Sequence, residues 1–145
     1  MTFYLDTSAL VKLLVREEES DALRLVLAQR PTEHRVASAL VRTELRRTVR
    51  RLPGDLMPEA ERILAGLALV PVDDALLDIA GVLGPAVLRS LDAVHLAAAL
   101  RVAPLTAVLT YDERMAASAR SLGLPVWAPG TTATAGDDPD AVRKD

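Results

Sequence analysis

Short apolar runs alternate along the chain with longer segments in which apolar residues recur every three or four positions. The short runs are typical of buried strands, and the recurrence is typical of amphipathic helices. Five strands are predicted, over residues 2–5, 35–37, 69–72, 107–110 and 125–127. Seven helices are predicted, over residues 8–15, 20–29, 39–52, 58–67, 74–83, 91–101 and 113–122. This alternation predicts an α/β fold with a parallel sheet and helices on both of its faces.

Two of these helices begin after residues that commonly cap helices. Ser38 is predicted to cap the helix over residues 39–52, and Asp73 is predicted to cap the helix over residues 74–83.

The helix over residues 91–101 is apolar on nearly every side, which is typical of a buried helix. Asp92 and His95 lie three residues apart and share one face of it. On such a helix, we interpret His95 as a core histidine that is hydrogen-bonded to a backbone carbonyl. Asp92 is harder to explain structurally, because burying an unpaired carboxylate costs several kcal/mol.

The helix over residues 39–52 carries five arginines against a single acid, Glu44, which borders its apolar stripe. Glu44 has a structural explanation as an ion-pair partner of Arg47 or Arg51. The arginines have two interpretations, which stay open at this point: a solvated helix face, or a patch that faces phosphate groups.

The chain has 145 residues, enough for one domain with a well-buried core. Residues 1–128 are predicted to form this domain, and residues 129–145, rich in Pro, Gly, Thr, Ala and Asp, to form a flexible tail. The absence of Cys excludes disulfides and thiolate zinc sites, and two His residues argue against a histidine-rich metal site. A metal ion would therefore be held by oxygen ligands.

The net charge of −3 argues against a generally basic nucleic-acid-binding surface, but it leaves room for a local basic patch. No apolar run approaches the roughly 20 residues of a membrane-spanning helix. The first residues show no basic segment followed by an apolar one, as a secretory signal would. We therefore expect a cytoplasmic protein that makes no contact with a membrane.

Four carboxylates hold positions that favour a common site. Asp6 and Asp112 each follow a predicted strand at its carboxyl end, where open α/β sheets bind their ligands. Asp92 lies in the first turn of the buried helix, and Glu44 lies at the border of a buried face. Asp6 and Asp112 also have a structural explanation as helix N-caps, worth about 1 kcal/mol each.

If these four acids gather, they need a cation to remain ionised together. Two carboxylates ~4 Å apart repel each other by about 4 kcal/mol at an effective dielectric constant near 20. Mg²⁺ and Mn²⁺ are hard cations that suit a site made of carboxylates and water. Such an ion lowers the pKa of a bound water and neutralises charge on a phosphoryl group, which suits phosphodiester hydrolysis.

The acids lie in segments with a specific order: LDTSAL at residues 5–10, Glu44 on its helix, LDAVHLAAA at residues 91–99 and LTYDERM at residues 109–115. Together with GLPV at residues 123–126, these segments resemble the PIN-domain ribonucleases. They resemble more closely the VapC-type toxins of bacterial toxin–antitoxin pairs. The resemblance extends from Thr2 to about Pro129, and all four acidic positions are filled.

This resemblance implies a three-layer α/β/α sandwich around a parallel sheet of about five strands. It also implies a Mg²⁺- or Mn²⁺-dependent endoribonuclease that cuts structured RNA of the tRNA or rRNA class. Asp6 and Asp92 would be the principal metal ligands. Glu44 and Asp112 would complete the catalytic pocket, by binding the ion through water or by orienting the attacking water. Ser8 would hydrogen-bond within this pocket.

The resemblance further implies two partners. One is a VapB-type antitoxin, whose carboxyl-terminal segment wraps the toxin and can insert a basic side chain among the acids. The other is a second copy of the chain, in a homodimer. Arg89 is left with two roles, as a contact to RNA phosphate or as a partner of a pocket acid.

Two other functions remain open: a protein-binding module whose acidic pocket has no catalytic role, and a DNA-cutting enzyme with a PIN-like fold. A phospho-accepting receiver domain is disfavoured, because the only lysines are Lys12 and Lys144 and neither lies near the last strand. A haloacid-type phosphatase would need an aspartate where this chain has Ser8. A dinucleotide-binding domain would need a G-x-G-x-x-G segment after the first strand, and the sequence has none.

Overall fold

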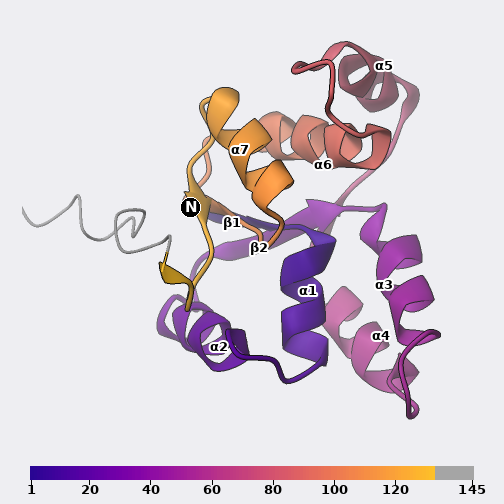
Figure 1. Ribbon diagram of the computed structural model, residues 1–145, viewed down its shortest axis with the longest axis vertical. Coiled ribbons are helices and arrows are strands. Elements are labelled where there is room, and N and C mark those ends of the chain that lie inside the picture. The colour runs from indigo at the N-terminus through magenta and orange to yellow at the C-terminus, as the bar shows by residue number, and fades with distance from the viewer. Residues whose placement is uncertain (133–145) are drawn as a thin grey trace, which may run out of the picture.

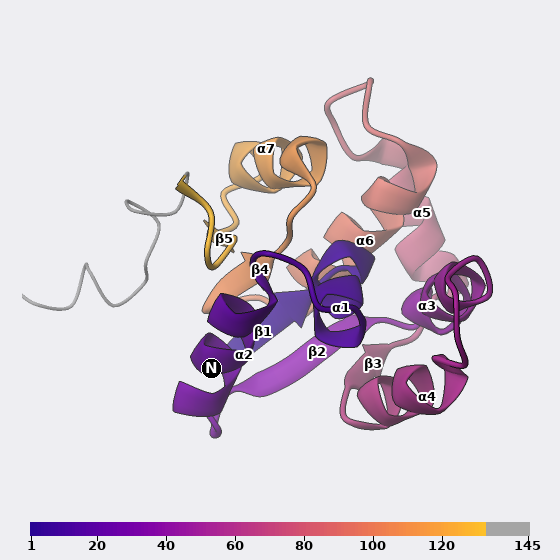
Figure 2. The same cartoon turned by 60° about the horizontal axis from the view of Figure 1, so that its bottom comes forward.

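A computed structural model of the chain describes residues 1–132, and these residues form a parallel sheet of five strands with seven helices around it (Figure 1). The strands are β1 (Thr2–Leu5), β2 (His34–Ser38), β3 (Ala68–Val70), β4 (Ala107–Leu109) and β5 (Val126–Trp127). They lie in the order β3-β2-β1-β4-β5, and all neighbouring pairs are parallel. Figure 2 shows β1 in the middle of the sheet, between β2 and β4.

The helices cover both faces of this sheet, as the alternation of strands and helices predicted. They are α1 (Thr7–Leu14), α2 (Ser20–Gln29), α3 (Val41–Val49), α4 (Met57–Ala65), α5 (Asp74–Val82), α6 (Ser90–Arg101) and α7 (Glu113–Ser121). One apolar core lies between the sheet and α1 to α4, and a second lies between the sheet and α5, α6 and α7 (Figure 1). The prediction of a three-layer α/β/α sandwich is confirmed.

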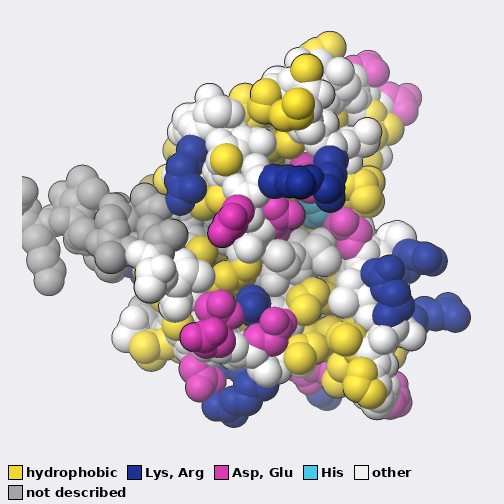
Figure 3. Space-filling model, viewed as in Figure 1, with side chains coloured by type: hydrophobic (Ala, Val, Ile, Leu, Met, Phe, Trp, Pro, Cys, Tyr) yellow, Lys and Arg dark blue, Asp and Glu magenta, His cyan; other side chains and the backbone are white. Residues whose placement is uncertain are grey.

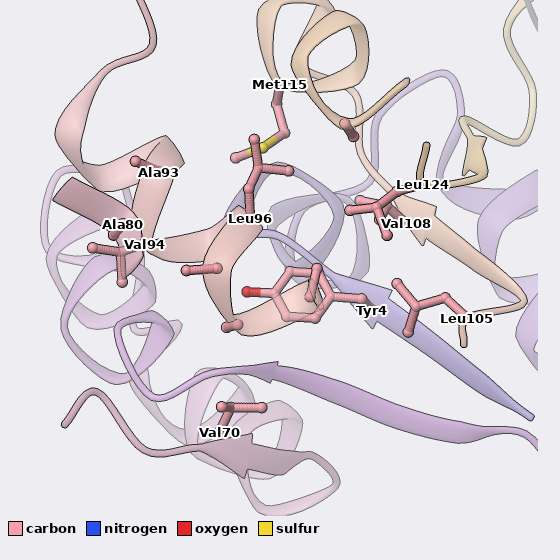
Figure 4. Close-up of a cluster of buried hydrophobic side chains, with 14 of the residues drawn as sticks. Tyr4, Val70, Ala80, Ala93, Val94, Leu96, Leu105, Val108, Met115 and Leu124 are labelled. Carbon is pink, nitrogen blue, oxygen red and sulfur yellow. The ribbon is translucent and has the colours of Figure 1, made fainter. Parts of the chain in front are cut away.

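Strand β1 joins the two cores because its side chains alternate between the faces of the sheet. Phe3 and Leu5 belong to the core beneath α1 to α4, and Tyr4 belongs to the core beneath α6. All three side chains are buried, which explains why this strand reads as a continuous apolar run. Figure 4 shows the ring of Tyr4 between the sheet and α6, in the same cluster of buried side chains as Leu96 and Val108.

Helix α6 is buried along most of its length, as its apolar sequence predicted. Its alanines have small side chains, and the helix packs against both β2 and α5. This position brings residues of the first turns of α6 toward the carboxyl ends of β1 and β4.

The two predicted caps differ in outcome. Asp73 caps α5 as expected, with its carboxylate Oδ1 2.9 Å from the backbone nitrogen of Leu76. Ser38 does not cap α3: it is the last residue of β2, and α3 begins only at Val41. The reason is pairing with β3, which extends through Ser38 and continues with a hydrogen bond from the nitrogen of Ala39 to the carbonyl of Val70.

A flexible tail was predicted over residues 129–145, of which residues 133–145 lie outside the described residues. Within the described part, Pro129 is buried and its carbonyl accepts a hydrogen bond of 2.8 Å from the hydroxyl of Tyr111. None of the helices in residues 1–132 has the length and apolar character needed to span a membrane.

Candidate active site

The candidate site lies at the carboxyl ends of β1 and β4, which are neighbours in the sheet. Leu5 pairs with Leu109, and the backbone nitrogen of Asp6 donates a hydrogen bond of 3.3 Å to the carbonyl of Leu109. Asp6 and Thr110, the residues that follow these strands, therefore lie side by side. Helices α1 and α7 begin just beyond them, so the chain turns away from the sheet at the same edge twice.

Asp6 is 4% exposed and receives three hydrogen bonds. Its Oδ1 accepts from the hydroxyl of Ser8 at 2.6 Å and from the backbone nitrogen of Ala9 at 3.1 Å. Its Oδ2 accepts from the hydroxyl of Thr110 at 2.5 Å. Burial raises the pKa of Asp6, although these hydrogen bonds oppose the shift. Asp6 thus caps α1 and also places a poorly solvated carboxylate at the sheet edge.

Ser8 and Thr110 tie the segment after β4 to the segment after β1. The hydroxyl of Ser8 accepts a hydrogen bond of 2.9 Å from the backbone nitrogen of Tyr111. The hydroxyl of Thr110 accepts one of 3.1 Å from the backbone nitrogen of Asp112. The position of Asp112 is therefore linked to that of Asp6 through a single threonine hydroxyl.

Glu44 reaches the site from the first turns of α3, and its Oε1 accepts two hydrogen bonds. The hydroxyl of Thr7 donates at 2.7 Å, and His95 Nε2 lies at 2.6 Å. Burial raises the pKa of Glu44, but the contacts with His95 and Thr7 outweigh it and leave the pKa below its usual value. The alternative that Glu44 pairs with an arginine of its own helix is wrong.

His95 is buried, as predicted, but its partners are side chains and not a backbone carbonyl. The backbone nitrogen of Ser38 donates to the Tyr4 hydroxyl at 3.1 Å, so the phenol proton is free to point to His95 Nδ1, 2.9 Å away. That assignment leaves the ring proton on Nε2, where it is donated to Glu44. A continuous hydrogen-bonded chain therefore runs from β2 through the core to Glu44.

Asp92 and Asp112 complete the set at the first turns of α6 and α7. Asp112 caps α7, with its Oδ1 2.9 Å from the backbone nitrogen of Arg114. Burial raises the pKa of Asp92, and the negative charge of Asp112 raises it further. Glu44 acts on this pKa in the same direction, while His95 and Arg89 oppose it. Asp92 therefore lies within electrostatic range of both of these acids.

The four predicted acids thus lie in segments that border the carboxyl ends of β1 and β4: Asp6 and Asp112 follow these strands, and Glu44 and Asp92 lie in the first turns of α3 and α6. Figure 3 shows acidic side chains in the depression between α1 below and α6 and α7 above, with basic side chains along its border and over α3.

No three acidic or histidine side chains within residues 1–132 are close enough together to form a ready-made metal site. The donors are nevertheless carboxylate oxygens, and Mg²⁺ is commonly held by one or two carboxylates with water and substrate phosphate. Their chemistry therefore fits a hard divalent cation.

The arginines of α3 and of the two residues that follow it fall into two groups. Arg46 forms an ion pair with Glu61 on α4, through Nε at 2.7 Å and Nη2 at 3.0 Å. The others form no ion pair with any residue in the part of the chain that the structure describes, and they are exposed: Arg42, Arg47, Arg50 and Arg51.

Sequence reasoning selected the four acids as candidates, but it did not identify the side chains that contact them directly or through one another: Thr7, Thr110, Tyr4 and His95. The available signals were weak. Thr7 directly follows Asp6, Thr110 lies at the end of a strand, and His95 shares a helix face with Asp92.

The family model described as PIN domain matches residues 3–121 of the chain. Ribonuclease VapC46 of Mycobacterium tuberculosis is 49% identical over 127 residues, which cover 87% of this chain and 96% of the relative. Ribonuclease VapC35 of the same species is 44% identical over 130 residues, covering 88% and 96%. Ribonuclease VapC47, also of this species, is 42% identical over 132 residues, with the same coverage.

No solved structure matches the chain significantly. The family match spans most of the chain, and the three relatives are similar to it over nearly their whole length. The chain therefore belongs to the PIN domain family, and within it to the group that contains the VapC ribonucleases.

Proposed function

We propose that this protein is a metal-dependent endoribonuclease, the toxic component of a toxin–antitoxin pair, which hydrolyses phosphodiester bonds in structured RNA of the tRNA or rRNA class. The proposal is supported by the positions of Asp6, Glu44, Asp92 and Asp112 on segments that border the carboxyl edge of the sheet, where Thr110 links Asp6 to Asp112 and His95 contacts Glu44. It is supported equally by relatives that are named ribonucleases.

We assign Asp6 and Asp92 as the residues that would hold the divalent ion, Mg²⁺ or Mn²⁺. When bound, such an ion supplies an activated water and neutralises charge that develops on the phosphate. The raised pKa values of both aspartates indicate carboxylates whose charge the protein alone leaves poorly compensated. A cation at this position would remove that imbalance.

We assign Glu44 and Asp112 to binding the ion through water or to orienting the attacking water. Glu44 has a lowered pKa, so it stays ionised near neutral pH and can accept a hydrogen bond or a proton from a water molecule. His95 and Thr7 hold its Oε1, which fixes the direction of the carboxylate. Asp112 lies at the first turn of α7, where its distance from Asp6 is set through Thr110.

Two partners are proposed, one from the VapC relatives and one from the exposed apolar side chains of α5. A VapB-type antitoxin would silence the enzyme by placing a basic side chain among the four acids. A second copy of the chain would cover the apolar side chains that α5 leaves exposed: Leu77, Ile79 and Val82. We expect the protein to act in the cytoplasm, where RNA substrates of the tRNA or rRNA class are found.

The proposal is tested with antitoxin-free protein and total bacterial RNA, in Mg²⁺ or Mn²⁺ and then in EDTA. Asp6→Asn is the decisive variant, because asparagine caps helices as well as aspartate does and carries no charge, although its amide nitrogen cannot accept the hydrogen bond that Thr110 donates to Asp6 Oδ2. Asp73→Asn is its matched control, since Asp73 caps α5 away from the four acids.

Discrete cleavage that needs metal, survives Asp73→Asn and disappears with Asp6→Asn supports the proposal. Cleavage that persists in Asp6→Asn would instead come from a contaminating ribonuclease. If folded wild-type protein cuts DNA and not RNA, the enzyme is a DNA nuclease. If it cuts neither, the pocket is a protein-binding site and the proposal is wrong.

A further inference from the structure

A cavity of about 530 Å³ opens beside Asp92, between the loop that joins α5 to α6 and the outer side of α7. Its size lies within the range of about 300–1,000 Å³ that is common for small-ligand pockets. Of the four acids at the candidate site, Asp92 is the one that lines this cavity. A molecule that fills the cavity is therefore a direct neighbour of the proposed reaction centre.

Two arginines line this cavity: Arg89, which precedes α6, and Arg114, in the first turn of α7. Both are exposed, and neither side chain forms an ion pair or hydrogen bond with any residue between 1 and 132. The positive charge of Arg89 lowers the pKa of Asp92, so it acts on the acidic site itself. Guanidinium groups without a protein partner are suited to bind phosphate, often through two parallel hydrogen bonds.

The remaining walls are largely apolar and include Val87, Leu88 and Ala117. Val87 is 88% exposed, so its side chain is available to a ligand. The planar face of an RNA base can lie against such walls or against a guanidinium plane, provided that the base is unpaired. Apolar walls with two free arginines thus match the two parts of a nucleotide, its base and its phosphate.

We propose that this cavity binds one unpaired nucleotide of the RNA, next to the phosphodiester that is cleaved. Arg89 and Arg114 hold the backbone phosphate, and Val87, Leu88 and Ala117 contact the base. The inference rests on the proposed ribonuclease function and adds to it a binding site for the nucleotide next to the cleaved bond, formed by Arg89, Arg114 and the apolar walls of this cavity.

The test measures binding in EDTA, where the RNA stays intact. A fluorescein-labelled hairpin RNA with an unpaired loop is compared, by fluorescence anisotropy over a range of salt concentrations, with a fully paired RNA duplex. Combining Arg89→Ala with Arg114→Ala should weaken hairpin binding roughly 10-fold and reduce the salt slope by about 0.7 for each phosphate that the protein no longer neutralises. Ala117→Trp should fill the cavity and abolish the preference for the hairpin over the duplex.

Matched controls separate this effect from changes in charge, bulk or folding. Arg16→Ala combined with Arg62→Ala removes the same charge from arginines that pair with nearby acids and do not line the cavity. Ala28→Trp adds the same bulk at an exposed position on α2. Each variant is compared with the wild type by its thermal unfolding midpoint, and the controls should bind RNA as the wild type does.

If the cavity variants bind and discriminate RNA as their controls do, while the wild type cleaves RNA, the cavity proposal is wrong and the ribonuclease function stands. If they bind RNA normally but no longer bind the antitoxin, the cavity belongs to the protein partner and the proposal is also wrong. If the wild type neither binds nor cleaves RNA, the proposed function fails and the inference fails with it.

Discussion

His95 Nε2 lies 2.6 Å from Glu44 Oε1, a contact that joins buried helix α6 to α3 across the carboxyl edge of the sheet. Because the Tyr4 hydroxyl occupies the other ring nitrogen, His95 is held in one orientation by two side chains from different elements. A buried histidine that faces a half-buried carboxylate does more than fill the core. It determines where the charge of Glu44 is placed.

Removing this donor should therefore impair catalysis. His95→Leu keeps an apolar side chain in the core but leaves Glu44 without its strongest contact, and loss of a supporting residue of this kind typically lowers activity or metal affinity by about 10- to 100-fold. His95→Gln retains an amide that can donate to Glu44 and should recover part of the activity. We expect the loss in kcat more than in KM for RNA, because His95 is buried away from the substrate surface.

The measurement is single-turnover and steady-state cleavage of one RNA by wild type, His95→Leu and His95→Gln, with Mn²⁺ affinity measured alongside. Equal activity of the leucine and glutamine variants would mean that His95 serves packing alone.

The hydroxyl of Thr110 is expected to be as important, because it donates to Asp6 at 2.5 Å and accepts from the backbone of Asp112 at 3.1 Å. Thr110→Val removes both hydrogen bonds, whereas Thr110→Ser keeps them. A hydrogen bond to a charged group contributes about 1.5–3 kcal/mol, so the valine variant should lose stability of this order and much of its activity. Urea denaturation and cleavage rates check both effects, and a valine variant that matches the serine variant would contradict the prediction.

The fold was predictable because strand and helix patterns are local. An apolar run, Phe3, Tyr4 and Leu5, is followed directly by the carboxylate of Asp6. Such a run predicts a buried strand with a candidate functional residue at its carboxyl end. The start of α3 was not predictable in the same way. It depends on how far β2 pairs with β3, and Ser38 stays in the strand because Val70, distant in sequence, pairs with it.

In the candidate site, too, the features that depend on local sequence were predictable and those that depend on packing between distant segments were not. The four acids could be selected from their positions relative to strands and helices. The partner of His95 could not, because it depends on how α3 packs near α6. The carbonyl groups near His95 are engaged within α6, so a side chain from α3 takes the place of the backbone partner that was predicted.

The arginines between residues 42 and 51, on α3 and just after it, are expected to contribute unequally to RNA binding. Arg46 is paired with Glu61, so its charge is already neutralised, whereas Arg47 and Arg50 form no ion pair among residues 1–132. Arg47→Ala combined with Arg50→Ala should weaken RNA binding and reduce the salt slope by about 0.7 per phosphate, while Arg46→Ala should change little. Salt titrations of RNA binding test this, and an unchanged slope in the double variant would identify the patch as a solvated helix face.

The last prediction concerns Asp6 and the stability of the metal-free protein. The pKa of Asp6 is raised by burial, so folding favours its protonated form. As pH rises above the ordinary aspartate value of about 3.9 and passes the folded pKa, the buried charge destabilises the fold, and this effect persists at neutral pH. Asp6→Asn removes the charge and keeps the cap, so it should unfold at a higher temperature than the wild type in EDTA.

Ionisation of Glu44 has the opposite effect on the stability of the fold from ionisation of Asp6. Its pKa is lowered in the folded protein, so its contribution to stability is present above its ordinary pKa and is lost as pH falls through the folded value. Glu44→Gln should therefore lower the unfolding temperature at neutral pH, where Asp6→Asn raises it. Mn²⁺ at about 100 times its dissociation constant should stabilise the wild type by about 2.7 kcal/mol and leave Asp6→Asn unchanged. Thermal unfolding in EDTA and in Mn²⁺ measures all three effects, and an Asp6→Asn protein less stable than wild type in EDTA would mean that the ionised carboxylate supports the fold.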